Sequence, residues 1–70
     1  MMLSEVPFEN LREGDIVISE KGKEGKISNL GHKGEMDSPS VDISWPAGGT
    51  STWIQYCDKI RYKGREGYMP

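Results

Sequence analysis

The 70-residue sequence has few of the features on which several classes of protein depend. Its single cysteine, Cys57, excludes an internal disulfide framework, and no stretch has the charged-then-apolar pattern of a secretory signal. No apolar run is longer than three residues, whereas a membrane-spanning helix needs roughly 20. The sequence therefore predicts a cytoplasmic protein that crosses no membrane.

Residues for catalysis or metal binding are equally scarce. His32 is the only histidine and lies 25 positions before Cys57, and a nucleophilic site also needs an orienting group and an oxyanion pocket. A structural zinc site takes four ligands, and the glycine motifs that cradle phosphates or dinucleotides are absent. We expect neither an enzyme nor a cofactor, with His32 a solvated loop residue and Cys57 a small buried one.

The sequence does contain many turn-forming residues between short apolar segments. Hydrophobic residues make up 34% of the chain and charged residues 29%, which is typical of a folded domain. Nine glycines and four prolines leave little room for long helices. A domain of this size buries only about 60% of its unfolded surface, so we expect a compact core and no large catalytic cleft.

Five segments have the composition of strands. The β-branched run from Ile16 to Ile18 lies between glycine-containing turns, and residues 40–45 alternate between apolar and polar side chains. Since three consecutive apolar side chains cannot all face one side of a strand, the segment carrying Phe8 is expected to cover the second face. The predicted strands lie near residues 15–20, 25–30, 40–45, 51–56 and 59–63.

The other segments are predicted to be irregular. Residues 1–10 are expected to form an N-terminal arm, residues 31–39 a mobile loop and residues 64–70 a flexible tail, which leaves residues 11–63 as a single domain. No helix is available to cover an open sheet. The predicted fold is therefore an all-β, five-stranded barrel, in which closure protects the strand edges.

Three short patterns follow one another along residues 11–63: Leu11-x-x-Gly14-Asp15-x-Val17, then Gly22-x-x-Gly25-x-Ile27, then Val41-x-Ile43-x-Trp45 with a glycine-rich hairpin. Together they resemble the Src-homology-3-like small barrels of the KOW and Tudor type. The resemblance implies a module that binds proteins or nucleic acids and rarely catalyses a reaction. KOW modules occur in ribosomal proteins and transcription elongation factors, and Tudor modules hold methylated side chains in an aromatic cage. This chain departs from the ribosomal pattern in being acidic, and a full cage cannot be placed in it residue by residue.

Four aromatic residues on the last three predicted strands are candidates for ligand contact: Trp45, Trp53, Tyr56 and Tyr62. Exposed rings could stack on bases, hold a cationic group or anchor a protein partner. A small barrel also needs bulky residues for its own core, so some of the four are expected to be structural. If Ile54 and Tyr56 point inward, alternation sends Trp53 outward, which makes Trp53 the predicted binding aromatic.

The net charge of −2 argues against a protein that mainly coats nucleic acid, but the basic residues are unevenly distributed. In barrels of this type the first hairpin and the last strand both flank the first strand. A basic face is therefore predicted, able to contact phosphates or an acidic partner. The alternative is that these lysines only solubilise the protein and protect edges. The residues concerned are Lys21, Lys23, Lys26, Lys59, Arg61 and Lys63.

The sequence thus favours a non-catalytic protein-interaction module, which could be a small regulator, bacterial accessory or phage-encoded, of a transcription or translation machine. The alternative is an RNA- or DNA-binding barrel that uses the basic residues and Trp53. Titration with nucleic acids at low and moderate salt separates the two, because phosphate contacts weaken with added salt. The oligomeric state is left open, since an unpaired strand edge or the loop of residues 31–39 could mediate assembly.

Overall fold

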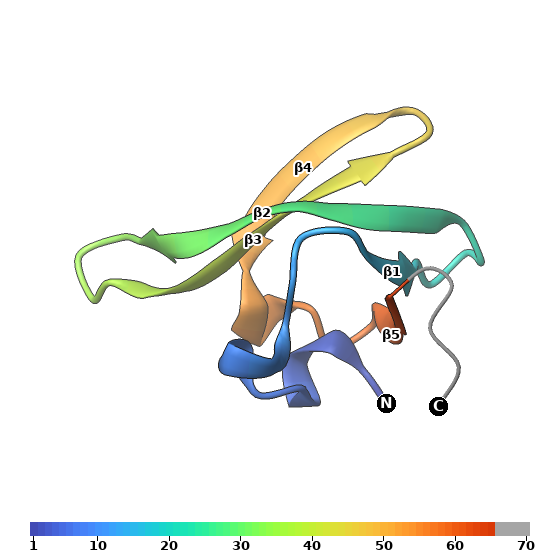
Figure 1. Ribbon diagram of the computed structural model, residues 1–70. Helices are drawn as coiled ribbons and strands as arrows, with labels where there is room; N and C mark the ends of the chain where they lie inside the picture. The colour runs from blue at the N-terminus through green and yellow to red at the C-terminus, as the bar shows by residue number, and fades with distance from the viewer. Residues whose placement is uncertain (66–70) are drawn as a thin grey trace.

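The computed structural model describes residues 1–65 and is all-β, with one five-stranded antiparallel sheet (Figure 1). Three single-turn 3-10 helices accompany the sheet: η1 (Leu3–Glu5), η2 (Phe8–Asn10) and η3 (Ile54–Tyr56). No helix within residues 1–65 is long and apolar enough to span a membrane. The strands are β1 (Asp15–Ile18), β2 (Glu24–Lys33), β3 (Ser38–Trp45), β4 (Gly48–Trp53) and β5 (Arg61–Arg65), in the order β4-β3-β2-β1-β5.

The strand β1 lies between β2 and β5, as predicted for the segments that flank the first strand. Val17 is paired with Gly25 on one side and with Tyr62 on the other. A tight turn joins β1 to β2, in which Gly22 has a φ of 85° and donates its N–H to the Ser19 carbonyl at 2.9 Å. A positive φ of this size suits glycine, so the turn depends on Gly22.

Before β1 the chain makes a second turn, over residues 12–15. Gly14 has a φ of 98°, and its N–H donates to the Ile27 carbonyl at 2.8 Å. The Asp15 side chain is 1% exposed, and its Oδ2 accepts hydrogen bonds from the Arg12 N–H and the Tyr62 hydroxyl, both at 2.9 Å. This carboxylate therefore joins the turn to β1 and β5.

The predicted loop of residues 31–39 is wrong for most of its length. Residues Gly31 to Lys33 belong to β2 and pair with Ser38 to Ser40 of β3, so the loop shrinks to residues 34–37. Gly34 and Asp37 take positive φ values of 83° and 51°, and the Asp37 N–H donates to the Gly34 carbonyl at 3.0 Å. The composition of residues 31–39 is typical of a loop, but residues 31–33 and residues 38–40 pair with each other across a hairpin.

The predicted strand of residues 51–56 is also shifted. The strand β4 begins at Gly48 and ends at Trp53, and residues 54–56 form η3. The turn lets Ile54 reach the core at 8% exposure while Tyr56 is 64% exposed, so the strand alternation assumed for these residues does not apply. The first predicted strand is shorter than expected and the last begins two residues later than expected.

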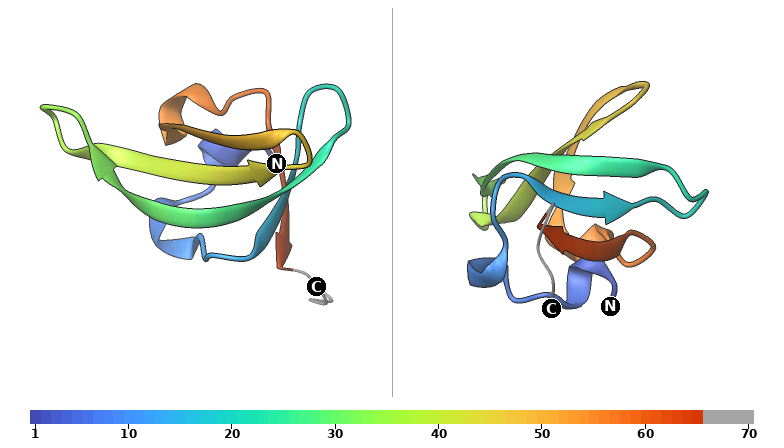
Figure 2. Two further views of the ribbon diagram at one scale, coloured as in Figure 1. Left: turned by 90° about the horizontal axis from the view of Figure 1, so that it is seen from above. Right: turned by 45° about the vertical axis from the view of Figure 1, so that its right-hand side comes forward.

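The prediction of an all-β fold with five strands is confirmed, but the sheet is not closed into a barrel. It curls around the N-terminal segment, and β4 and β5 form separate edges (Figure 2). The chain between these edges is η3 and one turn, over residues 57–60, rather than a strand, and η1 packs against η3.

The core lies on the inner side of the curled sheet. Leu3 and Val6, from the predicted arm, are buried in it together with residues of the strands. Phe8 packs against this cluster, while Ile16 is 5% exposed without belonging to it. Of the predicted tail, Gly64 and Arg65 belong to β5, and residues 66–70 lie outside the described part of the chain. The core residues are Leu3, Val6, Leu11, Val17, Ile27, Val41, Ile43, Ile54 and Cys57.

Candidate interaction surface

A shallow cleft of about 190 Å³ lies where the turn between β2 and β3 meets η3. One wall comes from the turn and the flanking strand ends, and the other from the end of β4 with η3. Two segments about 20 residues apart in sequence therefore build one surface. The side chains and backbone that line it belong to Lys33, Gly34, Glu35, Met36, Ser38, Trp53, Gln55 and Tyr56.

Trp53 holds the two walls together. Its indole Nε1 donates a hydrogen bond to the Lys33 carbonyl at 3.1 Å, and the Lys33 ammonium lies 4.8 Å from the ring centroid, in cation–π geometry. The same ammonium is 3.0 Å from the Ser51 hydroxyl oxygen, to which it donates. A Cβ added at Gly34 would come within 3.2 Å of the indole, so the turn approaches Trp53 closely.

Met36 and Tyr56 supply the exposed apolar surface of the cleft. They are 86% and 64% exposed, and within residues 1–65 only one other large hydrophobic side chain, Met1, is comparably exposed. The Tyr56 ring meets the Trp53 ring edge to face, with centroids 5.9 Å apart. The sequence analysis named Tyr56 among four candidate aromatics but did not choose it as the binding residue, because strand alternation was assumed for residues 51–56. Met36 was assigned to a loop and was not considered. The only available signal for Met36 was its position as an apolar residue between Glu35 and Asp37 in a segment predicted to be a loop.

The other two candidate aromatics are structural. The Trp45 ring lies over Gly25, where a Cβ would come within 2.5 Å of it, and its Nε1 donates to the Thr50 hydroxyl at 2.9 Å. Tyr62 is half-buried and donates its hydroxyl proton to Asp15. Trp53, which was predicted to point outward, is half-buried and contributes a wall of the cleft rather than a free ring.

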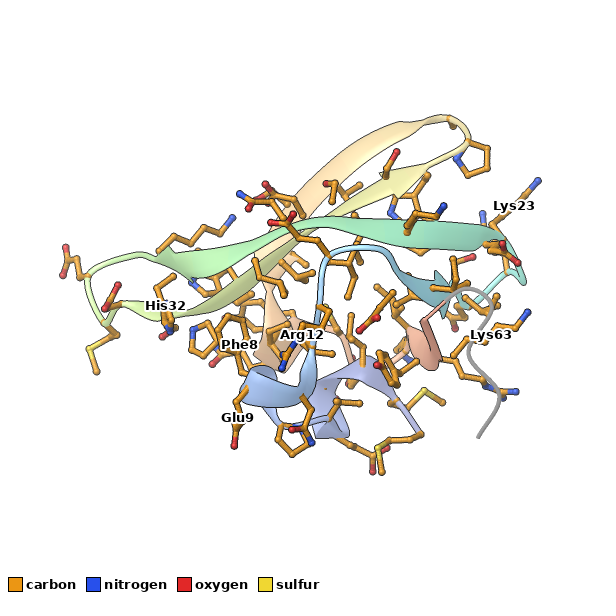
Figure 3. The ribbon with its side chains drawn as sticks, in the orientation of Figure 1. Phe8, Glu9, Arg12, Lys23, His32 and Lys63 are labelled. Atoms are coloured by element: carbon orange, nitrogen blue, oxygen red, sulfur yellow. The ribbon has the colours of Figure 1, made fainter. Side chains whose placement is uncertain are left out.

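All six predicted basic residues are exposed. Lys23 and Lys63 extend from the end of the molecule opposite the turn of residues 34–37 (Figure 3). Carboxylates lie among these basic groups: the Lys63 ammonium is 3.9 Å from a carboxylate oxygen of Glu24, in a pair that is exposed on both sides. Lys26 lies in β2, opposite Ile16 on one side and Ser44 on the other. The structure thus brings the basic segments to both sides of β1 but mixes them with acids.

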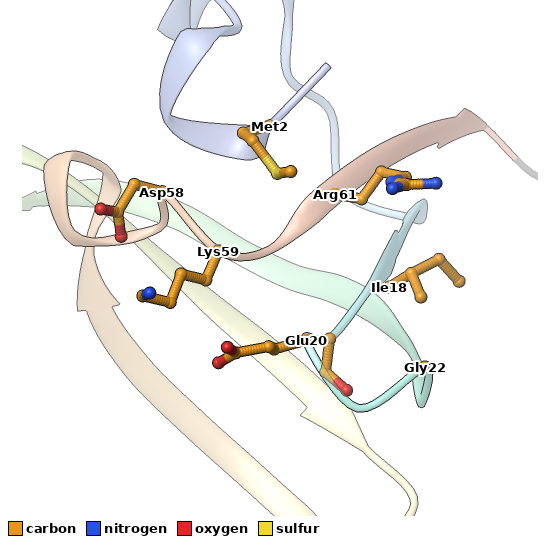
Figure 4. A pocket seen from close by; sticks show the side chains of 8 residues that line it. Met2, Ile18, Glu20, Gly22, Asp58, Lys59 and Arg61 are labelled. Atoms are coloured by element: carbon orange, nitrogen blue, oxygen red, sulfur yellow. The ribbon is translucent and has the colours of Figure 1, made fainter.

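Lys59 and Arg61 line an open pocket of about 440 Å³ between the β1–β2 turn and the start of β5 (Figure 4). Glu20 and Asp58 line the same pocket, so the charges of its two acidic and two basic residues cancel. The side chains of Lys59 and Arg61 point away from each other. Phosphate binding benefits from basic groups that converge, and this pocket does not provide such convergence.

His32 and Cys57 lie in different environments. The His32 ring meets Phe8 at a centroid distance of 5.1 Å (Figure 3), and the residue is exposed as predicted. Cys57 is fully buried, also as predicted, and its thiol donates to the Trp53 carbonyl at 3.5 Å. Burial raises the pKa of the Cys57 thiol, and the nearby Asp58 carboxylate adds to this effect. Residues 1–65 contain no group of three or more His, Cys, Asp or Glu side chains placed to hold a metal ion.

Comparison with models of known protein families gave no match, and neither did searches among curated proteins and among solved structures.

Proposed function

We propose that the protein is a non-catalytic interaction module that binds another protein through the cleft between the β2–β3 turn and η3. One observation carries this proposal: Met36 and Tyr56, two of the large apolar side chains exposed within residues 1–65, lie on the same cleft as Trp53. Aromatic residues and methionine are enriched at the centres of protein interfaces, where they provide large contact areas. The partner we propose is a component of a transcription or translation machine in the cytoplasm.

The chemistry of Cys57 agrees with a non-catalytic role. A nucleophilic cysteine needs an exposed thiolate with a lowered pKa, whereas the Cys57 thiol is fully buried and its pKa is raised. Its hydrogen bond to the Trp53 carbonyl instead connects the turn after η3 to the end of β4. Cys57 therefore has a structural contact with Trp53, a residue of the cleft, and its thiol is not accessible to a ligand.

We also propose that the domain has a Src-homology-3-like fold. A Src-homology-3-like module is supported by the five antiparallel strands, by the position of β1 between β2 and β5, and by the strong curl of the sheet. The open interval between β4 and β5 is the feature that departs from a closed barrel. Distance measurements in solution that find β4 and β5 diverging rather than approaching would contradict this assignment.

Site-specific crosslinking tests the proposed surface. A photoreactive phenylalanine analogue at Gln55, which is exposed and lines the cleft, is compared with the same analogue at Ser44, which is exposed on β3. In lysate of the source cells we expect protein adducts at position 55 that an excess of unlabelled native protein suppresses. A competitor carrying Met36→Ser and Tyr56→Ser should suppress them poorly. Equal adducts at both positions, or equal suppression by both competitors, would contradict the proposal.

Binding of RNA or DNA through the basic residues is the alternative function. It is supported by the placement of basic segments on both sides of β1 and opposed by the interleaved Glu20, Glu24 and Asp58. Titration of labelled single-stranded and double-stranded RNA and DNA at about 20 mM and about 150 mM salt distinguishes the two functions, because phosphate contacts weaken steeply with salt. Salt-sensitive binding that is lost in a Lys59→Gln, Arg61→Gln variant would favour the alternative.

A further inference from the structure

The two edges of the sheet differ in what lies beside them. Beside β5, the N-terminal residues occupy the open side: Met2 forms an antiparallel bridge with Arg61, and the Tyr62 N–H donates to the Met1 carbonyl at 2.8 Å. Just before β5, the Leu3 N–H donates to the Ile60 carbonyl at 2.6 Å. The edge formed by β5 is therefore covered by the chain itself.

The outer edge of β4 has no such cover within residues 1–65. No described strand pairs with it, and its residues from Gly48 to Ser51 are all exposed. A free edge presents a row of backbone N–H and C=O groups that can pair with another strand, and natural proteins usually block such edges with charged residues, proline or bulges. The strand β4 contains none of these: its sequence is Gly-Gly-Thr-Ser-Thr-Trp, and no register shift interrupts its pairing with β3.

Gly49, on the outer edge of β4, also indicates that another backbone can approach this edge. Its φ is not positive, and a Cβ built on it would lie 3.7 Å from the nearest atom, in ordinary contact with the Ile43 carbonyl oxygen. The fold of one chain therefore does not require glycine at this position. Glycine within a strand often marks a place where another backbone approaches closely.

We propose that β4 pairs antiparallel with β4 of a second copy of this chain, so that two five-stranded sheets join into one. Charge favours a second copy as the occupant. No residue of β4 itself is ionised, and the nearest charge, the Lys33 ammonium, is already bound to the Ser51 hydroxyl of its own chain at 3.0 Å. Self-pairing of β5 would instead set Arg61 and Lys63 against like charges. The interface goes beyond the cleft proposed above, since it uses the strand edge and leaves Met36 and Tyr56 open.

The alternation of the sheet restricts the register of this pairing. Residues that face each other across two antiparallel strands point to the same side of the sheet. A two-fold axis perpendicular to the sheet must then pass through one residue rather than between two. An axis at Ser51 sets Ser51 opposite itself, Thr50 opposite Thr52, and Gly49 opposite Trp53. Such a contact spans only about 17 Å of strand, so we expect a dimer that dissociates on dilution.

Introducing a positive or a negative charge at position 51 tests the pairing of β4 with its copy and the register of that pairing. Sedimentation equilibrium from about 10 µM to about 1 mM should show a monomer–dimer equilibrium for the native chain. Ser51→Lys and Ser51→Glu, each alone, should weaken dimerisation about 5-fold or more, because like charges directly opposite each other repel. An equimolar mixture of the two variants should restore it, which a loss of folding could not produce.

Two controls separate charge from other effects. Ser51→Ala removes the hydrogen bond from Lys33 without adding charge and should leave dimerisation unchanged. Ser44→Lys adds the same charge at an exposed position one strand further in and should also leave it unchanged. A native chain that stays monomeric up to about 1 mM overturns the proposal. So does a dimer that neither Ser51→Lys nor Ser51→Glu weakens.

Discussion

The covered and the open edge of this sheet differ in how they meet solvent. At the β5 edge the Tyr62 N–H donates to the Met1 carbonyl and Met2 bridges to Arg61, and the same N-terminal segment places Leu3 in the core at 0% exposure. The β4 edge receives no strand from residues 1–65 and bears no charged side chain. The N-terminal segment thus both covers the β5 edge and contributes to the core, whereas no segment within residues 1–65 covers the outer edge of β4.

The strongest test of this contrast removes the residue that anchors the cover. Leu3→Ala should lower the free energy of unfolding by about 2–5 kcal/mol, because it deletes a fully buried side chain and leaves a cavity. Urea denaturation measures the change, and Met1→Ala, at a side chain that is 72% exposed, should cost less than about 0.5 kcal/mol. If Leu3→Ala proved as mild as Met1→Ala, the N-terminal segment would not be an integral cover of β5.

A second substitution tests the packing of Trp45 over Gly25 of β2, because the Trp45 ring is also hydrogen-bonded to the open-edge strand β4. In Gly25→Ala the new Cβ would lie 2.5 Å from the Trp45 indole, so the ring must move away from its hydrogen bond with Thr50 of β4. We expect a loss of about 1–3 kcal/mol from overpacking. The control is Gly31→Ala, also in β2, where no atom lies within 4 Å of the added Cβ and the change should be neutral or slightly stabilising. Equal effects in thermal unfolding would contradict the role of Gly25.

A third test concerns the link between the covered edge and β1. Tyr62→Phe removes the hydroxyl that donates to Asp15 at 2.9 Å and should destabilise the fold by about 1–2 kcal/mol, because a buried carboxylate loses one of its donors. Tyr56→Phe makes the same chemical change at an exposed ring of the cleft and should be nearly silent in the same unfolding measurement. A larger loss for Tyr56→Phe than for Tyr62→Phe would reverse the contrast between the two regions.

The smallest expected effect is a pH dependence of the unfolding free energy that comes from Cys57, in the segment between β4 and β5. The pKa of the Cys57 thiol is raised by burial and by Asp58, so the folded state binds this proton more tightly than the unfolded state. Its stabilising contribution is complete below the unfolded thiol pKa of about 8.5 and declines as pH rises through the folded value. Between pH 7 and pH 10 the native protein should therefore lose more unfolding free energy than Cys57→Ala does. Equal pH profiles would show that the thiol does not ionise differently in the two states.

Much of the fold could be predicted because it depends on local patterns. The alternation of residues 40–45 and the β-branched run at Ile16 to Ile18 correspond to parts of β3 and β1. The two strands of the hairpin of residues 24–45 were predicted to be shorter than they are. Their polar ends are paired with each other across the hairpin, and composition does not reveal this pairing. The N-terminal residues were expected to be an arm, yet Leu3 and Val6 are core residues whose burial depends on contacts with distant segments.

The candidate surface was less predictable than the fold. Trp53 was identified as a binding residue from its type and position, and it does line the cleft. Tyr56 was a candidate but was not selected, because its exposure depends on a 3-10 turn where a strand was expected. Met36 was missed because a loop assignment says nothing about its neighbours. The basic residues were expected as one face, but their acidic neighbours could be placed only once the register of β1, β2 and β5 was known.

By itself the sequence determined the class of the protein: small, all-β and rich in turns. These properties follow from composition and from periodicities of a few residues, which act locally along the chain. Only the tertiary structure decided that the sheet stays open, that the N-terminus covers β5 and leaves β4 free, and that Met36, Trp53 and Tyr56 meet. Those outcomes depend on contacts between segments far apart in sequence, which no local pattern specifies.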